Sequence, residues 1–328
     1  MSQFTLRQLQ YFRAIAATGS ISAAAERERV SRSAIASSLD ELERGLGIQL
    51  CTLYKSHGVV LTSAGEEVLG RVISLLVQVE ELEATGSETK LAGAFTIGCF
   101  SSLAPTILPT MLKLFAETHP HAQLNFVVGS EDMLLEKLRA GELELVVSYD
   151  LSLDKAFSTV SLYETRMHVI LAGDHPLAQA DAVRAEQLRD EPLILMETPP
   201  SADDILGYFA ALGIAPNIRH RTSHFELARA LVGAGLGYSL FIQLPKISLS
   251  YEGKPVVARP LVPTPHLERA QIAWPAGRRL SAKARAFIAL AKENVDAYAP
   301  VSVYPSTGEV AALGAAAEHH GGQQVVTG

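Results

Sequence analysis

The sequence predicts an α/β protein with a small helical module, one long helix and a larger region of alternating strands and helices. Three observations support this prediction. Apolar residues recur at helical spacing over the first 50 residues, and residues 63–88 continue that spacing without a proline. From residue 91 onward, short apolar runs alternate with helical segments. The length of 328 residues suits two or three domains.

Composition excludes a disordered chain and a uniformly basic one. Apolar residues make up 48% and charged residues 19%, which is enough apolar material for sizeable cores. Lys and Arg number 28 against 35 Asp and Glu, so the net charge is −7. Residues 1–62 differ from this average, because they carry seven Lys or Arg and five Asp or Glu. The positive excess therefore lies in the helical module.

The first three predicted helices form a compact unit with a hairpin after it. Gly19 and Gly47 end the first and third helices, and Ser20 or Ser22 and then Ser31 are candidate N-caps for the second and third. The apolar faces of the first and third helices are Leu6, Leu9, Phe12 and Ile15, and then Ile35, Leu39, Leu42 and Leu46. Residues 49–62 suit a two-stranded wing with a polar tip.

Residues 63–88 are expected to form one long helix. Five apolar residues are spaced four, three, four and three positions apart, as in a heptad seam: Val68, Val72, Leu75, Val79 and Leu82. The helix could pack on its own domain, but the seam between two modules favours a linker that dimerises.

The rest of the chain alternates strands with helices, which predicts a parallel sheet with right-handed crossovers. The expected strands are 95–98, 124–128, 143–148, 192–196 and 236–241. The expected helices include 203–212, 225–232 and 282–295. Residues 299–328, rich in Gly, Ser, Ala, His and Gln, are expected to be a flexible tail.

The outer face of the third helix is the first candidate binding surface. It carries Arg32, Ser33, Ala36, Ser37 and Asp40, which are mostly short side chains. Short side chains let a helix enter the major groove of DNA, where one Arg can reach a guanine edge. An ordinary solvated surface would have a similar composition, so this pattern alone leaves both interpretations open.

Paired motifs over residues 6–65 resemble the winged helix-turn-helix of LysR-type transcriptional regulators. They include Leu6-Arg7-Gln8-Leu9, Gly19-Ser20, Ala24-Ala25, Val30-Ser31, Leu46-Gly47, Leu61-Thr62 and Ala64-Gly65. The similarity continues to about residue 298 and includes Val232–Phe241. It implies a winged helix-turn-helix at 1–62, a dimerisation linker helix at 63–90 and a two-lobed effector domain at 91–298. Lobe I would be 91–164 with 268–298, and lobe II would be 165–267.

The resemblance assigns DNA contacts to Arg32, Ser33, Ser37 and Lys55. It implies promoter DNA, a small-molecule effector and further copies of the chain, as a dimer or tetramer, as partners, with RNA polymerase as a further candidate. Arg32-Ser33 stands where the family usually has Gln-Pro, so the operator sequence that this helix reads is expected to be unusual.

The two-lobed region is similar to periplasmic binding proteins, which implies a ligand cleft at the strand ends. The expected lining is Ser101, Ser102 and Ser130 in one lobe, with Thr198 and Ser201 in the other. Hydroxyls converging on one cleft would suit an anion or carboxylate, although each could instead be a helix N-cap.

A thiol switch is the main alternative to a small effector. Cys99 follows a predicted strand near a helix start, where a lowered pKa would make it a redox sensor. A buried structural cysteine is the more common case. Cys51 and Cys99 belong to no CxxC or Cys/His cluster, so we expect no disulfide, no metal and no cofactor.

Two other classes of protein fit less well. A solute-binding protein would need an export signal and would have no use for residues 1–62. An enzyme is not expected, because the chain has no GxSxG, HExxH, P-loop or Gly-rich dinucleotide motif. The uncharged segment Leu91–Leu112 contains two prolines and two glycines, which suit a strand and buried helix better than a membrane span. We therefore expect a cytoplasmic protein without membrane contact.

Overall fold

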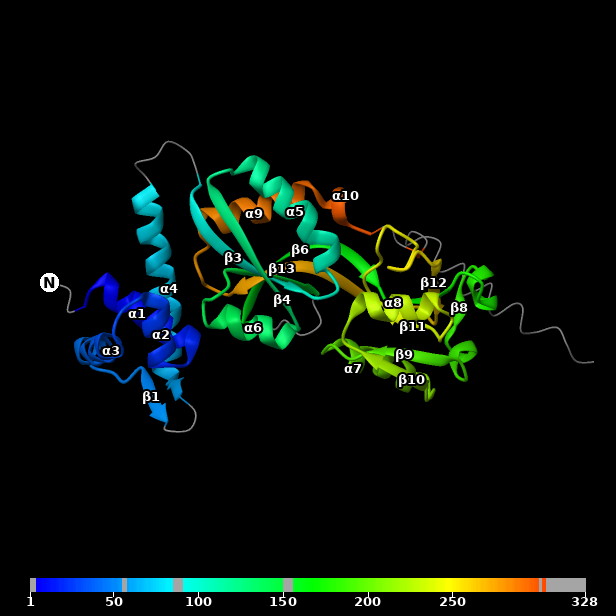
Figure 1. The fold of residues 1–328 in the computed structure, drawn as a ribbon, viewed down its shortest axis with the longest axis horizontal. Helices are drawn as coiled ribbons and strands as arrows, with labels where there is room; N and C mark the ends of the chain where they lie inside the picture. The colour runs from blue at the N-terminus through cyan, green and yellow to red at the C-terminus, as the bar shows by residue number, and fades with distance from the viewer. Residues whose placement is uncertain (1–3, 55–57, 85–90, 150–155, 301–302, 305–328) are drawn as a thin grey trace, which may run out of the picture.

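The chain forms an elongated molecule with the helical module at one end and two α/β lobes in line beyond it (Figure 1). The computed structural model describes residues 4–54, 58–84, 91–149, 156–300 and 303–304. Across these ranges, no helix combines the length and apolar character needed to cross a bilayer.

The helical module is a winged helix-turn-helix whose helix ends follow its caps. Thr5, Ser20 and Ser31 each accept a hydrogen bond from the amide three residues later, and Gly19 and Gly47 end two helices in the left-handed conformation. Its elements are α1 (Leu6–Thr18), α2 (Ile21–Glu28), α3 (Arg32–Leu46), β1 (Cys51–Tyr54) and β2 (Gly58–Leu61).

Hydrogen bonds donated by backbone amides hold the wing on the helices. The Glu43 carboxylate on α3 accepts the amides of Leu50 and Cys51 at 2.6 and 3.0 Å. On the other strand, the Val59 amide donates to the Gly19 carbonyl at 2.8 Å. The wing therefore has a defined position relative to α3.

The long helix α4 (Ser63–Ala84) divides its apolar residues between two faces. Val72 is 4% exposed and lies in the core of the winged helix with Leu69 and Leu76, against α1. Leu75 and Leu82 are 37% and 74% exposed. Placing Val72 in a seam between subunits is therefore wrong, because it packs within its own module.

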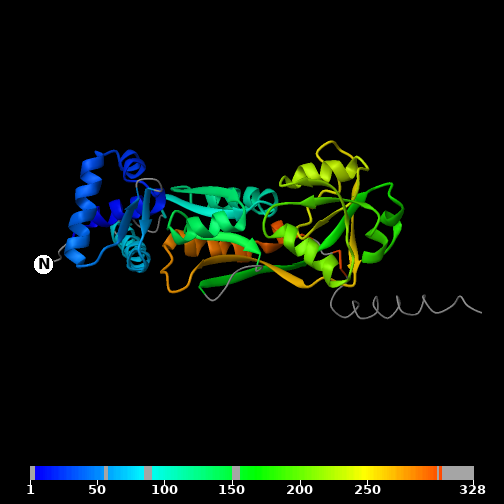
Figure 2. The same ribbon diagram turned by 90° about the horizontal axis from the view of Figure 1, so that it is seen from below.

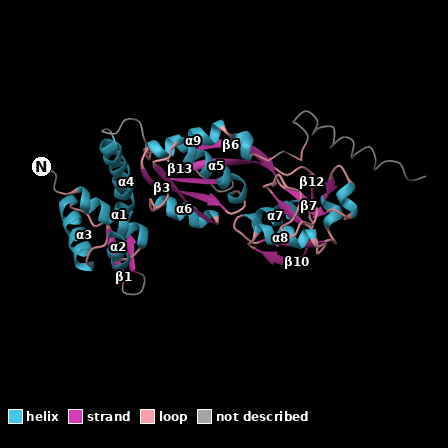
Figure 3. Ribbon diagram, turned by 45° about the horizontal axis from the view of Figure 1, so that its top comes forward, coloured by secondary structure: helices cyan, strands magenta, loops and turns pink. Residues whose placement is uncertain are grey.

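Lobe I contains a five-stranded mixed sheet in the order β4-β3-β5-β13-β6. Strands β3, β4 and β5 are parallel, which confirms the prediction for the three expected strands, whereas β13, which was not predicted, runs antiparallel to both β5 and β6. Helices α5 and α9 cover one face and α6 covers the other (Figure 3). The elements are β3 (Gly93–Phe100), α5 (Ala104–Thr118), β4 (Ala122–Gly129), α6 (Glu131–Arg139), β5 (Leu145–Tyr149), β6 (Phe157–Arg166), β13 (Leu267–Pro275), α9 (Ala282–Glu293) and α10 (Val295–Tyr298).

Lobe II has its own core and a sheet in the order β11-β7-β12-β8. The parallel pair β10-β9 lies beside it through a bridge between Leu193 and Tyr238. The elements are β7 (His168–Ala172), a 3-10 turn at Pro176–Gln179, β8 (Val183–Arg184), a second 3-10 turn at Ala185–Leu188, β9 (Pro192–Met196), α7 (Ser201–Ala211), β10 (Asn217–Thr222), α8 (Phe225–Gly233), β11 (Ser239–Phe241) and β12 (Val256–Val262).

Two short connections join the lobes. Strand β6 ends at Arg166 and β7 begins at His168, while residues 263–266 connect β12 to β13. The two lobes lie end to end, one on either side of these connections (Figure 2).

Part of the expected tail is attached to lobe II. The hydroxyl of Tyr304 accepts the Leu261 amide and donates to the Met167 carbonyl. The prediction of a flexible tail from residue 299 is therefore wrong at Tyr304. Residues 305–328 lie outside the described part of the chain.

Gly65 and Gly70 on α4 allow a matched test of the contact between helix and wing. A Cβ at Gly65 would lie 2.1 Å from the Leu50 carbonyl oxygen, whereas a Cβ at Gly70 meets nothing within 4 Å. Gly65→Ala should lower the free energy of unfolding by roughly 1–3 kcal/mol through overpacking. Gly70→Ala should leave it unchanged or raise it by up to about 1 kcal/mol through helix propensity. Urea unfolding followed by circular dichroism measures both, and equal stability of the two variants would contradict this packing.

Candidate functional site

Helix α3 presents a buried face and an open face. Ile35 and Leu42 are fully buried in the module, while Arg32, Ser33 and Ser37 are exposed on the other side. Arg32 is the first residue of the helix, directly after the capping Ser31. The open face is therefore narrow, with one long cation at its N-terminal end.

The polar contacts of this face are local. The hydroxyls of Ser31 and Ser33 lie 3.0 Å apart, and Ser37 donates to Glu41 at 3.4 Å. Glu41 also accepts the side-chain amide of Gln8 from α1 at 2.9 Å. Lys55, the predicted wing contact, lies outside the described residues.

Arg29 is a further cation that the sequence analysis did not select. It is exposed, ends α2 in the left-handed conformation with φ of 56°, and stands three residues before Arg32. Its place in the turn before the third helix was visible in the sequence. Arg29 and Arg32 thus give the turn between α2 and α3 two exposed cations.

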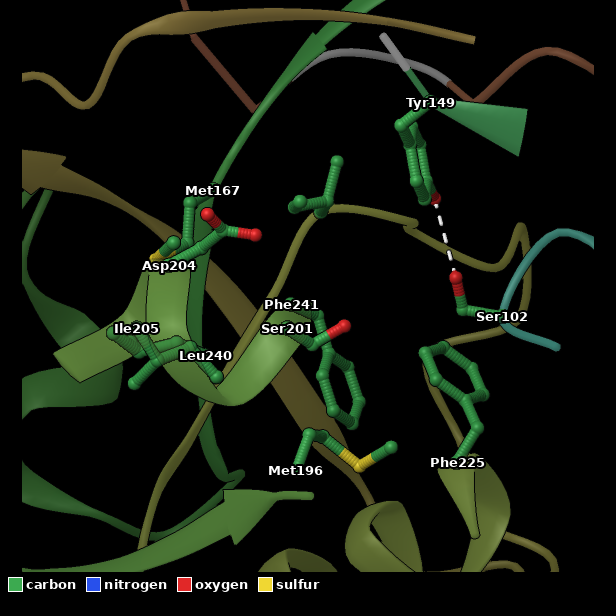
Figure 4. A pocket seen from close by; sticks show the side chains of 11 residues that line it. Ser102, Tyr149, Met167, Met196, Ser201, Asp204, Ile205, Phe225, Leu240 and Phe241 are labelled. Atoms are coloured by element: carbon green, nitrogen blue, oxygen red, sulfur yellow. Dashed lines mark hydrogen bonds between the residues drawn. The ribbon is translucent and has the colours of Figure 1, made fainter. Parts of the chain in front are cut away.

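A pocket lies between the lobes where several strands end. Its atom-free space is about 380 Å³, part of it open to solvent. The last residues of β5, β9 and β11 and the segment after β3 meet the first turns of α7 and α8 there (Figure 4). The lining consists of Ser102, Tyr149, Met167, Met196, Ser201, Asp204, Ile205, Phe225, Leu240, Phe241 and Ile242.

The structure brings only two of the five predicted hydroxyls to this pocket. Ser102 lies 3.3 Å from the Tyr149 hydroxyl, and Ser201 begins α7 on the opposite side. Ser101 and Ser130 do not contribute to the lining. Thr198 is also absent from the lining, because it is buried and donates its hydroxyl to the Ser223 carbonyl at 3.1 Å.

The lining is largely apolar and its one charged group is acidic. Asp204 has a buried Oδ2 with no hydrogen-bond partner among the described residues. Burial raises the pKa of Asp204, as does neighbouring Asp203, while His266 opposes the shift. An anion held by hydroxyls was the expected ligand, and an acidic group in the lining runs against that expectation.

A buried amide at the junction of the lobes supports the pocket from behind. Gln243 is 1% exposed, accepts the Tyr163 hydroxyl at 2.9 Å and donates to Thr106 at 2.7 Å. Tyr149, which lines the pocket, lies 3.5 Å from the same amide oxygen. Gln243 follows β11 of lobe II, whereas Thr106, Tyr149 and Tyr163 belong to lobe I. This polar group therefore ties the two lobes together.

Cys99 does not have the surroundings of a redox sensor. Its side chain is fully buried in the core between β3 and α5, and burial raises the pKa of the thiol far above its usual value. The lowered pKa considered from the sequence is wrong, because apolar packing disfavours the thiolate more than a nearby helix N-terminus can favour it.

These features define a protein with one face shaped for DNA and a separate pocket shaped for a small molecule. Two family models match the chain: the bacterial regulatory helix-turn-helix protein, lysR family, over residues 6–66, and the LysR substrate binding domain over residues 88–296. The chain belongs to the LysR family of DNA-binding transcriptional regulators.

Solved structures and relatives agree with this assignment. The C-terminal domain of a probable LysR family regulator from Rhodococcus sp. RHA1 is 39% identical, with a TM-score of 0.59, and covers 61% of this chain and 99% of its own. HinK from Pseudomonas aeruginosa is 30% identical, with a TM-score of 0.58, over 89% of this chain and 98% of its own. OxyR of Escherichia coli, a transcriptional dual regulator, is 26% identical over 76% of this chain and 81% of its own.

Both cysteines should resist modification in the folded protein. Burial, reinforced by Glu43, raises the pKa of Cys51 to about 12, and burial raises that of Cys99 further. Since a raised pKa keeps the thiol protonated, iodoacetamide at pH 8 should label neither cysteine in native protein and both in urea. Mass spectrometry gives the stoichiometry. Rapid native labelling of Cys99, lost in Cys99→Ser, would restore the redox hypothesis.

Proposed function

We propose that this protein binds an operator as a dimer through α3 and its wing, and that a small molecule between the lobes changes this binding. The open face of α3 with Arg32 at its start is the main support. A helix with short outward side chains fits the major groove, and residues near its N-terminus reach base edges in helix-turn-helix proteins.

The charges around α3 support binding by its N-terminal end. Arg29 and Arg32 lie at that end, whereas Asp40 and Glu41 follow two turns later. Phosphates attract the cations and repel the carboxylates, so this gradient favours entry of the N-terminal end into the groove. Ser33, Ser37 and Lys55 remain proposed contacts.

Dimerisation is supported by the outer face of α4. Leu75 and Leu82 are exposed one heptad apart, with half-buried Val79 between them. A second copy of α4 would cover these residues and place two α3 helices on neighbouring half-sites. Tetramers are an extension of the same proposal.

A binding protein, rather than a catalyst or an exported solute carrier, fits both domains. Its relatives are transcriptional regulators, and residues 6–66 match a DNA-binding module that an exported carrier would not use. Because its target is chromosomal DNA, we place the protein in the cytoplasm, with RNA polymerase as a partner to be tested.

Arg32 provides the direct test of operator reading. Arg32→Ala should cost roughly 1–3 kcal/mol in binding and relax the preference at one operator position. Arg44→Ala removes the same charge from the last turn of α3 and should leave base preference intact. Gel shifts on a set of operator variants, using DNA upstream of the protein's own gene, measure both. Equal losses on all sequences would assign Arg32 to the phosphate backbone.

The dimer proposal predicts different effects for substitutions at exposed and at buried positions of α4. The double variant Leu75→Glu, Leu82→Glu should give monomers by light scattering and lose operator binding, because charges replace the apolar contact. Val72→Ala should instead lower the free energy of unfolding by about 1–3 kcal/mol through a cavity in the module. A double variant that remains dimeric would remove α4 from the interface.

A further inference from the structure

The pocket between the lobes indicates what class of effector it takes. This question rests on the proposed function, since it concerns the same ligand site. Apolar side chains of lobe II supply most of the surface, including the stacked pair Phe225 and Phe241 with ring centroids 4.4 Å apart, and lobe I adds Ser102 and Tyr149. Neither Lys, Arg nor His is among the lining residues. A carboxylate ligand that moved from water into this pocket would find no positively charged side chain in the lining. Its desolvation would therefore cost free energy.

At the N-terminus of α7, which could have held an anion, three of the first four amides already have acceptors. The amide of Ser201 donates to the Thr198 carbonyl at 2.8 Å, and the amides of Asp203 and Asp204 donate to the Pro200 carbonyl at 3.0 and 3.2 Å. Two carboxylates in this first turn already complement the positive end of the helix dipole. An anionic ligand would therefore lie against a negative charge.

Asp204 is instead suited to accept a hydrogen bond. Its Oδ2 is buried and unsatisfied, a state that costs free energy and that a donor on a ligand would relieve. Asp204 and Ser201 lie on one side of the pocket, and Ser102 and Tyr149 lie on the other (Figure 4). The aromatic pair and Met196 lie below them, where an apolar body would be in contact.

We propose that the effector is a compact, non-acidic molecule with an aromatic or aliphatic body and an N–H or O–H group that donates to Asp204. Phe225 and Phe241 contact the body, and Ser102 and Ser201 provide further polar contacts at its edge. The atom-free space, about 380 Å³ with part of it open to solvent, is limited and therefore favours a compact body.

Three probes of one shape test this proposal on the full-length protein: benzyl alcohol, benzylamine and benzoate. Calorimetric titration and thermal shift should show binding of the alcohol and the amine, with benzoate at least tenfold weaker. Asp204→Ala should weaken the two donor-bearing probes about five- to tenfold through loss of one hydrogen bond. The control Asp203→Ala, at the exposed neighbouring position, should bind all three probes as the wild type does.

Asp204→Asn keeps the volume and an acceptor oxygen and removes the charge. It should retain benzyl alcohol within about twofold and weaken benzylamine about threefold, less than Asp204→Ala does, since a neutral hydrogen bond replaces a stronger ionic one. This variant also guards against a folding defect in Asp204→Ala.

Three results would each contradict the proposed class of ligand. They are tighter binding of benzoate than of the donor probes, donor-probe affinities that Asp204→Ala does not change, and no binding of either donor probe. The proposed function is tested separately by operator gel shifts of the wild type and Arg32→Ala in the absence of the small-molecule probes. Arg32-dependent operator binding with preference for benzoate means that only the ligand class is wrong. If the wild type shows no specific operator binding, the proposed function is contradicted, whichever small-molecule probes bind.

Discussion

The paired strands that pass between the lobes determine where this regulator can bind a ligand. Strands β6 and β13 pair along their whole length, from Arg166 with Leu267 to Phe157 with Pro275, and each continues into lobe II within a few residues. The lobes therefore share one ribbon, and the strand ends that face each other beside it enclose the pocket. At this junction Gln243 of lobe II is held by Tyr163 and Thr106 of lobe I, which adds a polar contact between the lobes.

A second contact connects α4 to lobe I in the same chain. A Cβ at Gly141, which has φ of +74°, would lie 2.3 Å from Cδ1 of Ile73. Only glycine permits both this backbone conformation and this close approach. Ile73 belongs at the same time to the core of the winged helix. The turn after α6 thus contacts the helix that carries the DNA-binding module.

The helices of the module could be predicted closely because their signals are local. Ser20, Ser31, Gly19 and Gly47 act through hydrogen bonds and dihedral angles within a few residues of each helix end. Strands β6 and β13 were not predicted, since each pairs with a segment about 100 residues away and carries mixed side chains. The seam was wrong at Val72 for the same reason, and its exposed positions remain a prediction. Spacing identifies an apolar stripe, but Val72 and Leu75 differ in what covers them.

The sequence by itself determined the family, the order of the domains and the placement of Arg32 at the start of the recognition helix. Those properties depend on residues close together in the chain, whose motifs and caps act locally. Tertiary structure alone decided the chemistry of the effector pocket. In the folded chain, Thr198 donates its hydroxyl to the Ser223 carbonyl, Cys99 is buried, and the carboxylate of Asp204 is part of the lining. Helical and strand periodicity specify which residues face inward, but the groups that meet across two lobes depend on how those lobes pack.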